Sequence, residues 1–210
     1  EKNLHLFFWL STQVYVAYSQ QGNSSVWPMG IPRLRFPKDA PSRSTLKLEE
    51  AFHYYLDEQT QQEWLREGMT GVDLGAAPGG WTWQLVHKGL QVIAIDNGAM
   101  DKALMQTGQV EHLKVDGFKF RPERPVNWLV CDMIESPARV AQTIASWVAD
   151  GAAERAIFNL KLPMKKRFEE LLHCRDLMDG ILSAKNVNYR LAFKQLYHDR
   201  EEVTGYLYRC

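Results

Sequence analysis

The stretch GVDLGAAPGGWTWQLV, residues 71–86, decides the fold. Val72 and Leu74 are apolar and lead into a glycine-rich segment, which is typical of a β-strand that ends in a turn. Gly79 and Gly80 then precede apolar residues at helical spacing, which predicts a helix. The first N–H groups of such a helix are free, and glycine lets a ligand approach the backbone closely. The stretch therefore predicts a nucleotide-type binding site between a strand and a helix.

The composition of the turn favours one kind of ligand over another. The dinucleotide fingerprint is G-x-G-x-x-G, but here position 77 is Ala, and Pro78 removes one N–H donor. A pyrophosphate needs those donors, so a NAD-dependent dehydrogenase is the less favoured alternative. A ligand with an amino-acid tail and an adenosine suits the turn better, and this describes S-adenosylmethionine. The residues expected to bind it are Gly75, Ala76, Ala77, Pro78, Gly79, Gly80 and Trp81.

Three acidic residues close the apolar runs that follow the turn. Asp96 ends LQVIAID, Asp116 follows the run VEHLKV, and Asp132 follows VNWLVC. In a parallel sheet such residues lie at the edge where ligands bind, and an acid about 20 residues after the turn commonly binds ribose hydroxyls. We therefore expect Asp96 to bind the ribose, Asp116 the adenine amino group, and Asp132 to border the same site. Asp116 could instead only cap a loop.

The rest of the chain completes an α/β pattern. Two strands are expected in residues 4–18, a helix from Ser44, a helix around 137–150, a fifth strand in 155–163 and a long helix in 166–183. Two final strands are expected in 189–209, around a turn at 198–201. This order predicts a Rossmann-like class I methyltransferase fold. Such a fold has a mostly parallel seven-stranded sheet, an antiparallel last strand and helices on both faces; another α/β fold with an antiparallel edge strand is the alternative.

Composition and charge limit the class of protein. The 210 residues suit one sizeable domain with a small addition, and no apolar stretch reaches the roughly 18 residues of a membrane span. Cys131, Cys174 and Cys210 form no paired spacing, which indicates a reducing, cytoplasmic setting and no metal site. The net charge is zero, but residues 33–47 hold five basic and one acidic side chain, and residues 155–210 hold 11 and 7.

The two basic segments flank residues 48–154, which hold 8 basic and 16 acidic side chains. A localised excess of positive charge is the footprint of a polyanionic partner, although ordinary solvated surface would give similar counts. The path expected for RNA crosses Arg33, Arg35, Lys38 and Arg43 and continues over Lys165, Lys166 and Arg167.

Four polar residues occupy places where folding alone needs few of them. Lys47 lies just before the apolar face of the first predicted helix, and Asp132 ends the fourth strand. Lys161 lies near the end of an otherwise apolar strand, and Glu202 begins the last strand. A lysine is costly to bury there unless it is paired, and the two acids are candidate partners. Alternatively, the Lys161 ammonium simply reaches water.

The motifs RSTLKLEEA, DLGAAPGGW, CDMIESP, FNLKLP and REEV, taken in order, resemble those of the FtsJ-like ribose 2′-O-methyltransferases. The resemblance spans about residues 33–209 and implies a catalytic Lys-Asp-Lys-Glu tetrad at Lys47, Asp132, Lys161 and Glu202, with Glu201 as an alternative fourth member. It implies that Lys161 takes the proton of the ribose 2′-hydroxyl. Ser44 is expected to reach the cofactor carboxylate. The segment DMIESP departs from the family's usual DMAP, which affects the shape of the target pocket.

The resemblance is strongest to the subfamily that methylates a cytidine of 23S ribosomal RNA, which predicts ribosomal RNA as the partner of a monomer that binds neither DNA nor membranes. It also implies a domain order: residues 1–25 as the end of a preceding THUMP-containing region, 26–42 as a linker and 43–210 as the methyltransferase domain. The remaining alternatives are a base-directed methyltransferase and a non-catalytic RNA-binding module. Cys131 argues against a C5-directed enzyme, because it precedes Asp132 and should point to the opposite face.

Overall fold

The computed structural model describes residues 2–20, 22–25 and 27–210 and separates into two compact units, Glu1–Leu34 and Arg35–Cys210. The first unit contains the antiparallel strands β1 (Lys2–Leu10) and β2 (Gln13–Gln20), followed by the short 3-10 helix η1 (Pro28–Gly30). The prediction of two strands around a turn is confirmed. Large apolar side chains on both faces of this hairpin are exposed, including Phe7, Phe8, Trp9 and Tyr15.

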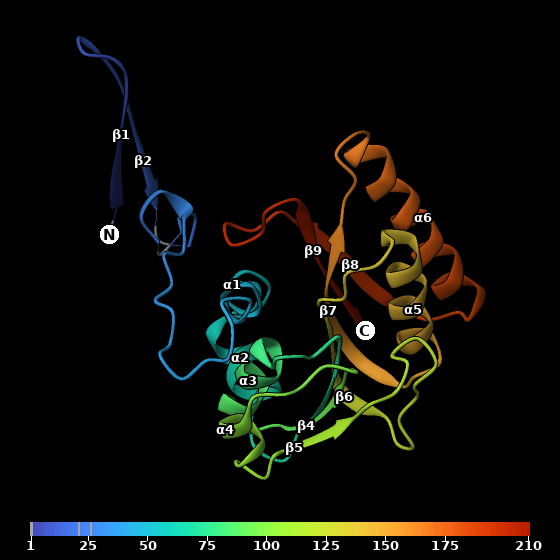
Figure 1. Cartoon of the computed structure of the whole chain (residues 1–210). Helices are drawn as coiled ribbons and strands as arrows, with labels where there is room; N and C mark the ends of the chain where they lie inside the picture. Colours follow the sequence, from blue (N-terminus) through green and yellow to red (C-terminus); the bar gives the residue numbers. More distant parts are fainter. Residues whose placement is uncertain (1, 21, 26) are drawn as a thin grey trace. The chain divides into compact units, whose positions relative to one another are not determined.

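The second unit is built on a seven-stranded sheet in the order β5-β4-β3-β6-β7-β9-β8 (Figure 1). Its strands are β3 (Thr70–Leu74), β4 (Gln91–Ile95), β5 (Val110–Leu113), β6 (Val126–Cys131), β7 (Ala153–Lys161), β8 (Tyr189–Lys194) and β9 (Glu202–Arg209). β9 pairs antiparallel with both β7 and β8, so it runs opposite to the other six strands of this sheet. The predicted mostly parallel sheet with an antiparallel last strand is confirmed. That strand lies inside the sheet, between β7 and β8.

Helices cover both faces of the sheet, as predicted (Figure 1). α1 (Thr45–Tyr55), α2 (Glu58–Trp64), α3 (Gly80–His87) and α4 (Lys102–Met105) contribute to one hydrophobic cluster. α5 (Pro137–Ala149) and α6 (Arg167–Ala184) contribute to the other. In α1, the apolar residues Leu48, Ala51 and Phe52 recur at helical spacing and are buried, so the predicted apolar face packs on the core.

The sheet brings its polar residues to one edge. Asp96 follows β4, Asp132 follows β6 and Lys161 ends β7, all at the carboxyl ends of parallel strands. Because β9 runs in the opposite direction, its first residue, Glu202, lies at this same edge and pairs in register with Lys161. α1 reaches the edge beside α3, where the Trp81 indole N–H donates to the Ser44 carbonyl oxygen at 3.0 Å.

Candidate active site

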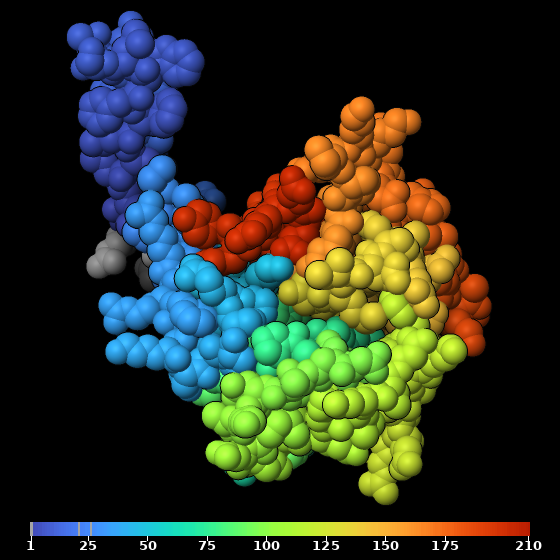
Figure 2. Space-filling model, viewed as in Figure 1, coloured from blue at the N-terminus to red at the C-terminus, as the bar shows by residue number. Residues whose placement is uncertain are grey.

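The structure brings Lys47, Asp132, Lys161 and Glu202 together in one charged cluster. The Lys161 ammonium contacts a carboxylate oxygen of both Asp132 and Glu202. The Lys47 ammonium contacts Glu202 and lies 3.4 Å from Asp132. In Figure 2 the cyan surface of α1, the yellow surface that follows β6 and the red surface before β9 adjoin on one face of this unit. Two cations therefore alternate with two carboxylates at the edge of the sheet.

The cluster is shielded from water but remains reachable. The side chains of Lys47, Asp132, Lys161 and Glu202 are 17%, 16%, 24% and 7% exposed, respectively. Partial burial of this kind strengthens the attraction between opposite charges, because less water screens it. The charges of the cluster are therefore paired with one another while part of each side chain stays accessible.

Burial and pairing act in opposite directions on the pKa values of the cluster. Burial lowers the pKa of Lys161. The charges and hydrogen bonds of Asp132 and Glu202 raise it by more than burial lowers it, so the pKa lies above its usual value. For Glu202, burial raises the pKa, and the two lysines lower it more strongly, so it lies below its usual value. All told, Lys161 carries its proton and Glu202 is ionised in the site as it stands.

The choice between the two adjacent glutamates follows from their environments. Glu202 is buried and contacts both lysines of the cluster. Glu201 is exposed and forms an ion pair with Arg167 at 3.2 Å. Neighbouring residues of a strand point to opposite faces, so only Glu202 faces the charged cluster.

The glycine-rich turn lies against the start of α1. Gly79, with φ of +119°, caps α3, and a left-handed conformation of this kind is readily adopted only by glycine. A Cβ atom on Gly80 would lie 2.3 Å from the Ser44 hydroxyl oxygen and 2.4 Å from that of Ser42. Ser44 therefore faces the backbone of the turn.

The other residues expected at the turn differ in their accessibility. Gly75 has φ of +78° and is partly exposed, as is Ala77, whereas Ala76 is buried and Pro78 is exposed. Trp81 is buried, so it contributes mainly by anchoring α3 to α1.

Asp96 is tied directly to this turn. Its carboxylate accepts the N–H of Ala77 at 3.0 Å and the N–H of Gly98 at 2.7 Å. It is partly exposed, so its remaining lone pairs can accept further hydrogen bonds. Asp116 is exposed, and its side chain accepts the N–H of Phe118 at 2.9 Å, which is the loop-capping contact considered from the sequence.

A buried carboxyl group beneath the turn was not assigned from the sequence. Asp73 lies in β3, accepts the Thr82 hydroxyl at 2.6 Å and is 1% exposed. Its other oxygen, Oδ1, is buried and has no hydrogen-bond partner among the described residues. Burial raises the pKa of Asp73 to about 7, although the Thr82 hydrogen bond opposes this. A polar residue within the apolar run GVDL was the signal for it.

These observations agree with the chemistry of S-adenosylmethionine. Side chains of Met133, Leu104 and Ser44 occupy the positions that a Cβ atom on Gly75, Gly79 or Gly80 would take, so glycine lets the turn pack closely there. The N–H groups at the start of α3 suit the carboxylate of the cofactor. The orphaned oxygen of Asp73 and the accessible carboxylate of Asp96 are acceptors for its ammonium and hydroxyl groups. Among the described residues, no group of three or more His, Cys, Asp or Glu side chains is arranged to hold a metal ion.

Cys131 is in no position to act as a nucleophile. Its side chain is 1% exposed and packs in the cluster on the α5 and α6 face, opposite the charged residues. Burial raises the pKa of its thiol to about 12, so the reactive thiolate is disfavoured. This removes the sulfur nucleophile that a C5-directed base methyltransferase requires.

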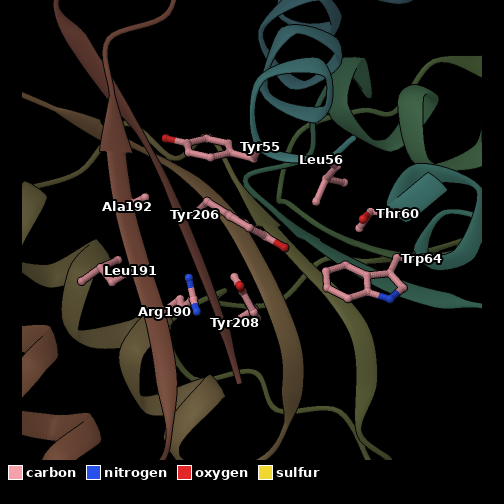
Figure 3. Close-up of a pocket in the computed structure, with 9 residues that line it drawn as sticks. All are labelled: Tyr55, Leu56, Thr60, Trp64, Arg190, Leu191, Ala192, Tyr206 and Tyr208. Carbon is pink, nitrogen blue, oxygen red and sulfur yellow. The ribbon is translucent and has the colours of Figure 1, made fainter. Parts of the chain in front are cut away.

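A separate hollow of about 590 Å³ lies away from the charged cluster, between β8 and β9 and the helices α1 and α2 (Figure 3). Aromatic rings dominate its wall, from Tyr55, Trp64, Tyr206 and Tyr208, and Arg190 adds a charge. None of the residues predicted for the cofactor or for catalysis lines it.

A doubly wound sheet, a glycine turn aimed at its carboxyl edge and an adjoining charged cluster define a class I methyltransferase. The sequence matches the FtsJ-like methyltransferase family over residues 40–179, and the chain belongs to this family. Membership of a methyltransferase family confirms the prediction of S-adenosylmethionine as the cofactor.

Curated relatives agree with this family assignment, and a solved structure shares the fold. The chain is 58% identical to "Ribosomal RNA large subunit methyltransferase M" of Methylococcus capsulatus and 55% identical to that of Cellvibrio japonicus. Each match covers 97% of this chain but only 57% and 58% of the relative, respectively. A Plasmodium falciparum protein described as a ribosomal RNA methyltransferase shares the fold, with a TM-score of 0.56 at 13% identity over 80% of this chain and 97% of its own.

Proposed function

We propose that this chain is the catalytic part of an S-adenosylmethionine-dependent enzyme that methylates a ribose 2′-hydroxyl of ribosomal RNA. The observation that carries the proposal is the cluster of Lys47, Asp132, Lys161 and Glu202 beside the glycine turn. The relatives named above support ribosomal RNA as the substrate, and the resemblance of the motifs supports a cytidine of 23S ribosomal RNA. Such a substrate would place the protein in the cytoplasm.

The residues have distinct roles in this proposal. The bound cofactor supplies an electrophilic methyl group on a sulfonium. Lys161 would accept the ribose hydroxyl proton at its Nζ atom while the ribose oxygen takes the methyl group that the bound cofactor would supply. Lys161 must be neutral at that moment, whereas its pKa lies above the usual value. Asp132 and Glu202 hold the ammonium in place, and Lys47 offsets part of their charge.

Alignment of the reacting atoms is the other source of rate. Holding an oxygen nucleophile in line with a methyl group removes much of the entropic barrier. Lys161 ends β7 and Glu202 begins β9, and these residues oppose each other in the ladder. Hydrogen-bonded strands therefore fix both groups before the substrate arrives.

The two basic segments are suited to RNA phosphates. Arg33, Arg35, Lys38 and Arg43 are exposed, as are Lys165, Lys166 and Arg167. Arg43 also lies over the Phe36 ring, 5.6 Å from its centre. Arginine and lysine side chains that neutralise phosphates supply sequence-independent affinity.

We also propose that the hairpin of β1 and β2 belongs to a preceding domain, with residues 26–42 as a linker to the methyltransferase domain of residues 43–210. The hairpin exposes Leu4, Phe7, Phe8 and Trp9 by more than 60%. An isolated two-stranded hairpin is marginally stable, and exposed apolar strands call for a covering partner. The relatives are longer than this chain, so they contain sequence that can provide one.

One experiment separates this function from its alternatives. The chain is incubated with unmethylated 23S ribosomal RNA and S-adenosylmethionine labelled in its methyl group, and the RNA is then hydrolysed with alkali. Alkaline cleavage needs a free 2′-hydroxyl, so ribose methylation leaves the label in an alkali-resistant dinucleotide. Label in a mononucleotide would identify a base-directed enzyme. Absence of label from RNA, with cofactor binding intact, would identify a non-catalytic module.

A further inference from the structure

A buried hydrogen-bond chain runs from Asp132 away from the charged cluster. The Asn159 side-chain amide donates to the Asp132 carboxylate at 3.2 Å. The Thr204 hydroxyl lies 2.8 Å from the Asn159 side-chain oxygen and 2.9 Å from Oδ2 of Asp199. Asn159 and Thr204 are fully buried, and Asp199 is 8% exposed. The chain thus links β6, β7, β9 and the loop before β9 behind the reacting groups.

We propose that Asn159 and Thr204 are positioning residues of the methyl-transfer site, which hold Asp132 through this chain and anchor it on Asp199. The effect of this chain on methyl transfer rests on the proposed function. Asp132 accepts hydrogen bonds from both Asn159 and Lys161 on the same oxygen, Oδ1. A shift of the carboxylate would therefore shift the ammonium that it holds.

The number of available protons determines the direction in which the hydrogen bonds of this chain are donated. A hydroxyl has one proton to donate, and ionised carboxylates and amide oxygens only accept. If Asp132 and Asp199 are both ionised, the Asn159 side-chain oxygen and the Asp199 carboxylate compete for the single proton of the Thr204 hydroxyl. A proton on Asp199 resolves the conflict, because Asp199 then donates to Thr204, Thr204 to Asn159 and Asn159 to Asp132. Every link of the chain is then satisfied in the direction of the active site.

The surroundings of Asp199 are compatible with a proton there. Its Oδ2 accepts the Leu196 N–H at 2.9 Å, and its Oδ1 is buried without a partner among the described residues. The charged and titratable groups that face it are Lys47 and Tyr55 of α1 and Glu202 of β9. Burial raises the pKa of Asp199 to about 6, and the Leu196 and Thr204 hydrogen bonds oppose this increase. The neighbouring His198 is paired with Glu50 instead.

A matched pair of variants at Thr204 tests the proposal. T204S keeps the hydroxyl and loses a methyl group, whereas T204V keeps the shape and loses the hydroxyl. We expect T204S to stay within about threefold of the wild-type kcat. We expect T204V to lose about 10- to 100-fold in kcat with an unchanged Kd for S-adenosylmethionine, because a small misplacement of reacting groups costs this much. A purely structural role predicts that T204V loses stability, because the buried Asn159 and Asp199 side chains lose a hydrogen-bond partner, while the kcat of the folded enzyme is unchanged.

Nuclear magnetic resonance provides a readout that does not depend on activity. The side-chain amide signal of Asn159 should move with pH near 6 in the wild type and T204S, and this movement should be absent in T204V. An Asn159 amide that ignores the titration in all three proteins overturns the proposal, as does equal kcat in T204S and T204V. If the wild type transfers no methyl group but the amide behaves as expected, the hydrogen-bond chain is supported and the proposed function fails.

Discussion

Replacement of Lys161 by methionine removes the proposed base while retaining an apolar stem of similar length. The variant cannot accept a proton from the ribose hydroxyl. General-base catalysis typically contributes about 10²- to 10⁴-fold to rate, so we expect methyl transfer to fall by at least that factor. K161R should fail as well, because arginine stays protonated.

The cost in stability follows from the contacts of Lys161. Its removal leaves Asp132 and Glu202 to share Lys47, which already contacts both. Breaking an isolated buried ion pair costs about 3–5 kcal/mol, but here one cation remains and Lys161 is 24% exposed. We therefore expect a loss of about 1–3 kcal/mol, equivalent to a fall in Tm of roughly 2–12 °C for a domain of this size. The variant should fold and bind S-adenosylmethionine.

The pH dependence of the wild type provides a second measure of the same group. A lysine with the usual pKa of 10.5 is neutral in about one molecule in 1,000 at pH 7.5, and Lys161 has a higher pKa. As long as the pH is below that pKa, each unit of increase in pH makes the neutral form about tenfold more abundant. Between pH 7 and 9, kcat/KM should therefore rise about tenfold per unit.

The assay is transfer of labelled methyl from S-adenosylmethionine to ribosomal RNA under single-turnover conditions, with cofactor affinity and Tm measured alongside. K185M is the matched control, because Lys185 forms a surface ion pair with Asp150 and both side chains are at least half exposed. K185M should behave as the wild type. Transfer by K161M within a few-fold of K185M, in a folded protein that binds the cofactor, would exclude Lys161 as the base.

Three further predictions concern the cofactor turn, the RNA surface and the buried acid. Asp96→Ala should weaken S-adenosylmethionine binding by about 1–3 kcal/mol; calorimetry with Asp57→Ala as a control, an exposed helix cap, would contradict this if both variants bind alike. Charge reversal at the basic residues should flatten the salt dependence of RNA binding and leave cofactor affinity unchanged; an unaltered slope would mean that these residues are ordinary surface. The residues to reverse are Arg35, Lys38, Arg43, Lys165 and Lys166. Asp73 has a pKa of about 7 in the folded state and about 3.8 unfolded, so folding favours its neutral form, and its contribution to stability falls as pH rises from about 4 to 7. Asp73→Asn should therefore raise the free energy of unfolding at pH 8, by up to roughly 4 kcal/mol, with a smaller gain at pH 5. Urea titrations that show the same difference at both pH values would refute this.

Most strands and helices of the second unit could be predicted from the sequence because they depend on local patterns. Alternating and helical periodicities placed the strands and helices of the second unit, and the glycines fixed where β3 turns into α3. The short helices α2 and α4 were not predicted, since four to seven residues carry too little periodicity. The position of β9 inside the sheet was also not specified, because strand order depends on contacts between distant segments.

The charged cluster was predicted, whereas the network behind it was not. Lys161 and Glu202 stood out as charges at strand ends, but Asn159 and Thr204 are neutral and lie two residues away on the same faces. Their positions in an apolar run were the available signal. Their partnership depends on the register of β7 with β9, which pairs Asn159 with Thr204, and a single sequence does not reveal that register.

The insertion of β9 between β7 and β8 has a consequence for biosynthesis. β7 can pair with β6 as soon as it is made, whereas β8 has no neighbour in the ladder until β9 leaves the ribosome and joins it. Glu202 arrives with that same strand, so Lys161 lacks one of its two carboxylate partners until β9 is made. The order of synthesis thus means that the charged cluster is completed only when β9 joins the sheet.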